Sequence, residues 1–104
     1  MAGISAEIID RVVRFKELAS RVIQIRKAIV FGSYAKGCQR EESDIDVCII
    51  SDNVTNNFLA LQSIMPFVVD VDYRIEPVVF SYAEYISQEN LGVLGEVKRY
   101  GIEV

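Results

Sequence analysis

The hydrophobic pattern of the chain switches repeatedly between helical and strand spacing. Apolar side chains recur every three to four residues over 5–25, with charged side chains mostly on the opposite face, and Ser5 is placed to cap that helix. The nearly all-apolar run 27–31 is typical of a central strand. The predicted helices cover residues 5–25, 33–36, 54–65, a segment starting after Ser81, and 91–100; the predicted strands cover 27–31, 44–51, 67–80 and 102–104.

The segment 67–80 shows the clearest strand pattern, because acidic and basic side chains alternate in it with apolar ones. Pro66 is expected to end the preceding helix, and Pro77 to mark a bulge, a break or an edge. Ser81 with Glu84 has the spacing of a capping box, and Gly101 is a good helix stop. The order of elements predicts a small α/β (α+β) fold, a mixed sheet with helices packed on it, in one domain over 1–104.

Composition narrows the chemistry. The chain has 104 residues, 51% hydrophobic, with a net charge of −4 and no histidine. The acidic balance argues against broad nucleic-acid binding, and no apolar run reaches the length of a membrane span. No signal peptide is evident, so a cytoplasmic location is expected. Cys38 and Cys48 are the only cysteines, which together with the lack of histidine argues against a zinc site. The lack of histidine also excludes His-dependent nucleophilic catalysis. Cys48 is expected to be a core residue.

Two aspartates mark the first candidate site. Asp44 and Asp46 stand two positions apart in a predicted strand, so their side chains point to the same face. Like charges held this close repel each other unless a cation lies between them. Carboxylates are the ligands that Mg²⁺ prefers, so the pair is a candidate metal site.

A glycine-serine turn precedes these aspartates by ten residues. Gly32 lets the backbone approach a ligand closely, and a helix starting at Ser33 presents free N–H groups suited to a phosphate. Lys36, one turn later, is placed to add a positive charge. Taken alone, Gly32-Ser33 is more simply a strand-to-helix turn, and it gains meaning only with Asp44 and Asp46 nearby.

Together these motifs are similar to the signature of the DNA polymerase β-like nucleotidyltransferase superfamily. The segment Gly32-Ser33-Tyr34-Ala35-Lys36-Gly37 resembles the Gly-Ser-x-Ala-Arg-Gly form of its minimal members, with Lys36 where arginine is common. Asp44-Ile45-Asp46 follows at the expected distance. The resemblance implies the superfamily's catalytic core fold.

The resemblance also implies a third carboxylate on a later strand. Asp70, Asp72 and Glu76 are the candidates, and they share one face if the strand is regular. In the family this acid often lies five residues before the Ser or Thr that caps the next helix. Counting back from Ser81 favours Glu76, although aspartate is commoner there, and Asp72 is the alternative. The alternative without a functional role is that these acids form the solvated face of a strand and pair with Arg74.

The implied reaction is transfer of a nucleoside monophosphate, with AMP from ATP favoured, to an acceptor hydroxyl. The resemblance places two Mg²⁺ ions on Asp44, Asp46 and Glu76, and the β- and γ-phosphates on Gly32 and Ser33, with Lys36 as a further contact. Such minimal enzymes resemble antitoxins paired with helical HEPN-type nucleases, and some attach AMP to a tyrosine of that partner. The alternatives are an inactive nucleotide- or partner-binding module and transfer to a small-molecule hydroxyl; a homo-oligomer is also left open.

Overall fold

Five helices and four strands make up the described part of the chain. A computed structural model describes residues 4–37, 43–87 and 91–104. The elements run in the order α1 (Ala6–Ala19), β1 (Ile25–Phe31), α2 (Ser33–Lys36), β2 (Ile45–Ser51), α3 (Asn57–Val71), β3 (Ile75–Ser81), α4 (Tyr82–Ile86), α5 (Gly92–Tyr100) and β4 (Ile102–Glu103).

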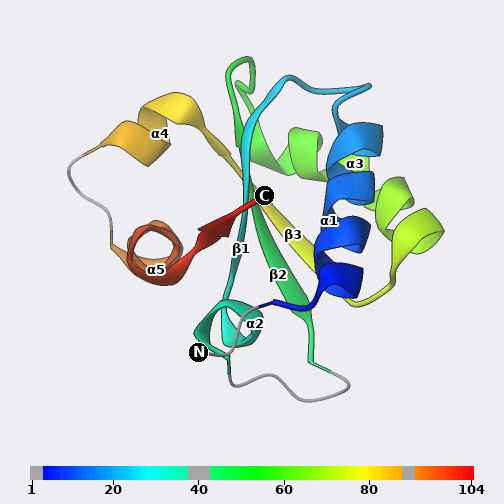
Figure 1. The fold of residues 1–104 in the computed structure, drawn as a ribbon. Helices are drawn as coiled ribbons and strands as arrows, with labels where there is room; N and C mark the ends of the chain where they lie inside the picture. Colours follow the sequence, from blue (N-terminus) through cyan, green and yellow to red (C-terminus); the bar gives the residue numbers. More distant parts are fainter. Residues whose placement is uncertain (1–3, 38–42, 88–90) are drawn as a thin grey trace.

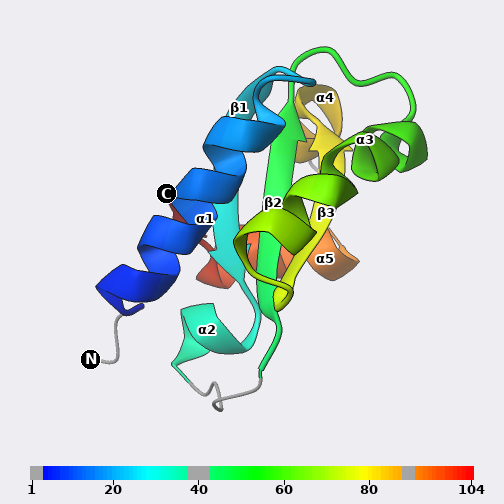
Figure 2. The same ribbon diagram turned by 90° about the vertical axis from the view of Figure 1, so that its right-hand side faces the viewer.

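The sheet is mixed, as the sequence predicts. Its strands lie in the order β3-β2-β1-β4 (Figure 1). β1 pairs antiparallel with β2 and with β4, whereas β2 and β3 are parallel and are joined by the crossover helix α3. The short helix α2 lies below one end of the sheet, where β1 ends and β2 begins (Figure 2).

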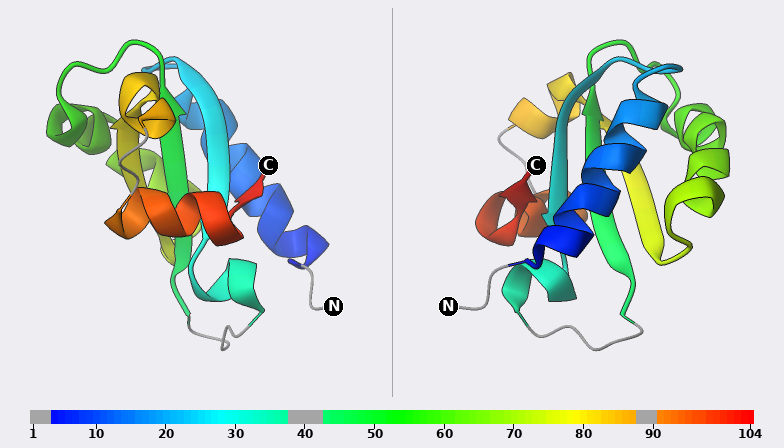
Figure 3. Two further views of the ribbon diagram at one scale, coloured as in Figure 1. Left: turned by 90° about the vertical axis from the view of Figure 1, so that its left-hand side faces the viewer. Right: turned by 45° about the vertical axis from the view of Figure 1, so that its right-hand side comes forward.

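Helices cover both faces of the sheet. α1 and α3 lie against one face, and α4 and α5 against the other (Figures 1 and 3). The larger core joins Val12 and Phe15 of α1 to alternate residues of the strands, including Val30 and Val47. The intervening strand residues form the smaller core with Val97 of α5; these are Ile29, Phe31, Cys48 and Ile50. Strand alternation therefore divides the apolar residues of β2 between the two cores.

The first helix is shorter than its hydrophobic pattern suggests. The Ser5 side chain accepts a hydrogen bond from the Ile8 N–H at 3.3 Å, so the predicted cap is confirmed. The helix ends at Ala19 and the chain turns before β1 begins at Ile25. The apolar residues Val22 and Ile23 continue the helical spacing into this turn, which is why the sequence pattern overshoots the helix end.

The prediction of one long strand over 67–80 is wrong in its first half. Residues up to Val71 belong to α3, which continues through Pro66, and β3 begins only at Ile75. Pro66 is tolerated because it lies on the exposed side of α3, where water can solvate the carbonyl that its missing N–H leaves free. Ile64 and Val68, four residues apart, are buried against the core and hold this second half in the helix.

The C-terminal part follows the sequence closely. Ser81 and Glu84 form the predicted capping box, and α5 ends before Gly101 as expected. The predicted final strand is present as β4. Cys48 is fully buried and burial raises its thiol pKa to about 12, in keeping with a core role. Cys38 and most of the predicted polar loop lie outside the described residues, and none of the described helices is long and apolar enough to cross a membrane.

Candidate active site

Asp46 and Glu76 lie side by side at one end of the sheet. Asp46 on β2 is opposite Glu76 on the parallel strand β3, and opposite Phe31, the last residue of β1. Asp46 is two residues before Cys48, and Glu76 is two residues before Val78. Because alternate strand residues share a face, both acids lie on the face of the smaller core, which α5 covers. The sheet register thus brings together two acids that are thirty residues apart in the sequence.

Asp44 joins this pair from just before β2. The carboxyl groups of Asp44 and Glu76 share a hydrogen bond, which is the main cause of a raised pKa for Glu76; burial and the charges of Asp44 and Asp46 add to it. The pKa of Asp46 is raised as well, first by burial and then by the negative charges of Asp44 and Glu96. Both pKa values are raised, as expected when neighbouring carboxylates repel each other.

The three acids fit a divalent cation by their chemistry. Hard oxygen ligands and an uncompensated negative charge are what Mg²⁺ requires. Over residues 4–37, 43–87 and 91–104, however, no three His, Cys, Asp or Glu side chains have the spacing of a complete metal-ligand set.

Gly32 is packed directly against Asp46. Its φ of 72° is a conformation that side chains rarely adopt, and a Cβ atom there would lie 2.1 Å from Oδ2 of Asp46. Glycine is therefore required at position 32 for two reasons, the backbone conformation and the lack of room for a side chain. The turn and the aspartate that the sequence places ten residues apart form one structure.

The predicted phosphate-binding residues lie at the start and end of α2. Ser33 is its first residue, and Gly32 at the N-cap position offers no side chain to the N–H groups of the first turn. Lys36 at the other end forms an ion pair with Glu96, and its ammonium lies 5.1 Å from the centre of the Tyr100 ring. Glu96 and Tyr100 are one turn apart on α5, so this helix holds the lysine from the side of the smaller core.

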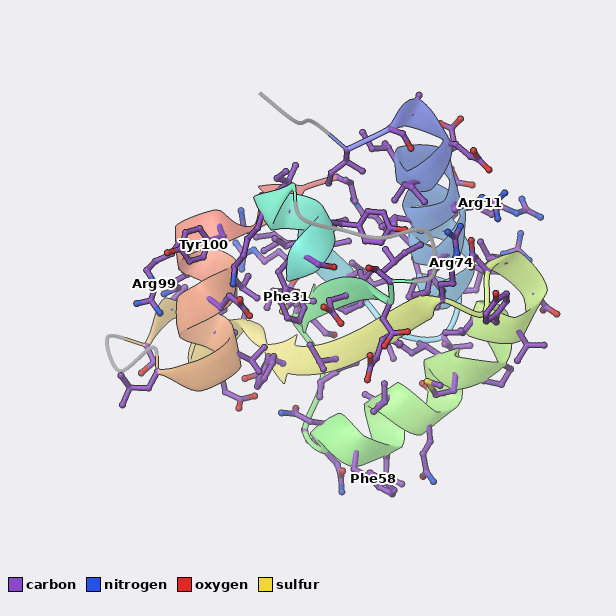
Figure 4. The ribbon with its side chains drawn as sticks, turned by 90° about the horizontal axis from the view of Figure 1, so that it is seen from below. Arg11, Phe31, Phe58, Arg74, Arg99 and Tyr100 are labelled. Atoms are coloured by element: carbon purple, nitrogen blue, oxygen red, sulfur yellow. The ribbon has the colours of Figure 1, made fainter. Side chains whose placement is uncertain are left out.

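Asp72 has a different surrounding from the three clustered acids. Its carboxylate accepts hydrogen bonds from Nη2 of Arg74 and Nη1 of Arg11, both at 2.8 Å, and its side chain is only 2% exposed. These bonds hold its pKa far below the ordinary value, with Arg74 as the main cause. Arg74 also reaches the Tyr34 hydroxyl at 3.5 Å, so this cluster links α1, α2 and the start of β3 (Figure 4).

The structure therefore separates the candidate acids, of which the sequence favours Glu76 over Asp72. Asp44, Asp46 and Glu76 come together beside Gly32, whereas Asp72 is neutralised by two arginines and Asp70 lies exposed in α3. Arg74 does pair with one of the predicted acids, namely Asp72. Glu96 was not among the predicted residues, because a single glutamate on an amphipathic helix carries no signal of its position.

Comparison with known proteins identifies the family of this chain. A family model described as a nucleotidyltransferase domain matches residues 12–100, which include every clustered acid. The chain belongs to the nucleotidyltransferase domain family. Its chemistry is therefore that of a nucleotidyltransferase, and its mixed sheet carries the clustered acids described above.

Individual relatives give the same result. A Methanocaldococcus jannaschii protein that carries the provisional name protein adenylyltransferase is 29% identical over 103 residues, covering 94% of this chain and 99% of the relative. A toxin–antitoxin structure with AMP-PNP shares the fold, with a TM-score of 0.63 at 21% identity over 95% of this chain and 72% of that one. A variant of the MntA–HpeT toxin–antitoxin pair matches with a TM-score of 0.59 at 15% identity, over 90% and 69% of the two chains.

Proposed function

We propose that this nucleotidyltransferase transfers AMP from ATP to a hydroxyl group of a partner protein and requires Mg²⁺. The observation that carries the proposal is the convergence of Asp44, Asp46 and Glu76 beside the Gly32 turn. The name of the archaeal relative supports adenylyl transfer to protein, and the solved neighbours, which are toxin–antitoxin structures, support a partner protein. We propose that this partner is a helical HEPN-type protein.

In this proposal one group of residues binds the metal and another binds the phosphates. Asp44, Asp46 and Glu76 would hold Mg²⁺, which neutralises the phosphates and the departing pyrophosphate when it is bound. Gly32 and Ser33 bring backbone N–H groups, and Ser33 a hydroxyl, to the β- and γ-phosphates at the start of α2. Lys36 adds a positive charge once the phosphates compete with Glu96 for it. The partner's hydroxyl, a tyrosine in the leading form of the proposal, attacks the α-phosphorus and pyrophosphate leaves.

A binding module without turnover is the second candidate. It is favoured by one observation, the hydrogen bond by which Glu76 is tied to Asp44 instead of facing an open ligand set. Glutamate is also one methylene longer than the aspartate usual at this position of the family. Such a protein would bind ATP and its partner but leave both unchanged.

The test combines label transfer with nucleotide binding. The chain, purified with its co-purifying partner, is incubated with ATP labelled at the α-phosphate and with Mg²⁺. We expect label on the partner, lowered at least about 100-fold by Asp44→Asn, Asp46→Asn or Glu76→Gln. Asp52→Asn is the matched control, since Asp52 is an exposed residue that accepts a hydrogen bond from Arg26. Binding of ATP without any labelling would support the module, and labelling unaffected by Asp46→Asn would end the enzyme proposal.

A further inference from the structure

The outer side of α3 carries an apolar stripe that nothing in the described chain covers. Phe58 is 65% exposed, Leu59 59%, Met65 42% and Val69 81%. Figure 4 shows Phe58 on the outer side of the helix, pointing away from the sheet. The outer stripe, as we define it, consists of the exposed residues Phe58, Leu59, Gln62, Met65, Pro66 and Val69.

The stripe is continuous and uncharged. Phe58, Gln62, Met65 and Val69 follow one another at steps of four, three and four residues, which places them on one face of a helix. It runs along about 17 Å of helix. Apolar residues scattered singly on a surface are ordinary, but a contiguous row of them marks an interaction surface. Asp70 is the only charged residue in the whole of α3.

We infer that the outer stripe is the contact between two copies of this chain, packed with their α3 helices antiparallel. The chain has a net charge of −4, so most pairs of surfaces on two copies would repel each other. The outer stripe is free of this penalty because it bears no charge. Two-fold symmetry also matches a surface to itself, so an apolar stripe always meets an apolar stripe.

The spacing of the stripe suits this symmetry. With the two-fold axis between Ser63 and Ile64, Phe58 lies opposite the partner's Val69 and Gln62 lies opposite the partner's Met65. A large residue then meets a smaller one at each end of the contact. Gln62 is the one polar member, and near the axis its amide is close enough to the partner's helix to keep a hydrogen-bonding partner.

Charge complementarity favours the antiparallel direction. In this register Asp70 lies opposite the partner's Asn57, at the start of the partner's α3. The N-terminal end of a helix attracts negative charge, and the first turn of α3 has no acidic residue of its own. A parallel pair would instead place the two Asp70 carboxylates side by side.

This pairing leaves the candidate active site accessible. α3 lies on the sheet face that carries the larger core, whereas Asp46 and Glu76 lie on the face covered by α5. A dimer formed through α3 therefore presents two outward-facing sites. A single helix pair buries less than the roughly 1,600 Å² of a standard interface, so we expect a dissociation constant on the order of micromolar.

The first test measures oligomeric state by sedimentation and light scattering over a range of concentrations. We expect the chain to dimerise, and Val69→Asp to raise the dissociation constant more than about tenfold, since it places two charges in an apolar contact. Val22→Asp makes the same change at an exposed position after α1 and should leave the dissociation constant of the dimer unaltered. Both variants should keep the far-ultraviolet circular dichroism of the folded chain.

The second test reads the register by disulfide formation, in a Cys38→Ser background. Phe58→Cys combined with Val69→Cys should give a covalent dimer on oxidation, because these positions meet across the axis. Phe58→Cys alone should not, since two copies of residue 58 are about 17 Å apart and a disulfide needs Cα atoms within about 7 Å. The inference is overturned if the chain stays monomeric to about 1 mM, which includes the case in which the outer stripe binds another protein. It is also overturned if Phe58→Cys alone forms the disulfide rapidly.

Discussion

A Cβ atom on Gly32 would lie 2.1 Å from Oδ2 of Asp46, so no side chain fits between the turn after β1 and the carboxylate of β2. Gly32→Ala must push one of them away and also places alanine at a φ of 72°. We expect label transfer to fall at least about 100-fold, the usual cost of moving reacting groups by about 1 Å.

Gly92 supplies the control for that substitution. Its φ of 62° is equally unfavourable for alanine, but a Cβ atom there would meet nothing within 4 Å. Gly92→Ala should lower the free energy of unfolding by about 1–2 kcal/mol without a specific loss of transfer. Equal losses of transfer in both variants would mean that backbone strain, and not the approach to Asp46, explains the first result.

Asp46→Asn should make the metal-free chain more stable and insensitive to magnesium. The pKa of Asp46 is raised by burial and by Asp44 and Glu96, so its charge is unfavourable where no cation is bound. Thermal unfolding at neutral pH in EDTA should show a higher midpoint for the variant than for the wild type. Added Mg²⁺ should then raise the midpoint of the wild type and of Asp52→Asn but leave Asp46→Asn unchanged.

Lys36 and Glu96 should affect nucleotide binding in opposite directions. Glu96 holds the Lys36 ammonium and adds negative charge near Asp46. Glu96→Gln should therefore tighten ATP binding by roughly two- to fivefold, the range of an exposed ion pair, and Lys36→Met should weaken it. Isothermal titration with Mg²⁺ measures both constants. If both variants weaken binding equally, the pair serves only to attach α5 to α2.

Asp72→Asn should destabilise the fold by about 2 kcal/mol, because it removes the buried anion to which Arg74 and Arg11 donate hydrogen bonds. Asp70→Asn, an exposed change two residues earlier, should alter the free energy of unfolding by less than about 0.5 kcal/mol. Chemical denaturation of the two variants provides the comparison.

The same cluster sets a pH dependence. The pKa of Asp72 is lowered in the folded chain, so its contribution is present above the unfolded value of about 3.9 and is lost as the pH falls below it. The wild type should therefore lose more stability than Asp72→Asn between about pH 5 and pH 2. Parallel acid titration curves for the two proteins would contradict this assignment.

Much of the site was predictable because its signals are local. The turn at Gly32 and the alternation of Asp44 and Asp46 in an apolar strand depend on a few adjacent residues. The partner acid was harder to choose, because an even spacing of acids implies one shared face only if the whole segment is a strand. Asp72 leaves that face because it ends a helix.

The length of α3 could not be predicted from the pattern around Pro66. Residues after this proline alternate apolar and polar side chains and are rich in valine, which favours a strand. The buried positions Ile64 and Val68 fit a helix equally well, and the choice depends on packing against α1 and β3. Likewise, no local pattern predicts the ion pairs of Asp72 with Arg11 and of Lys36 with Glu96, because the partners in each pair are about sixty residues apart in the sequence.

The position of β2 between β3 and β1 has a consequence for how the site is lost. Asp46 and its neighbours belong to the strand whose backbone is paired on both sides and whose other residues are buried. Amide hydrogens in such a strand exchange with solvent only when the whole sheet opens, whereas helix ends and turns exchange through small local openings. Asp46 should thus keep its position through the fluctuations that fray α4 or α5, and lose it only in global unfolding.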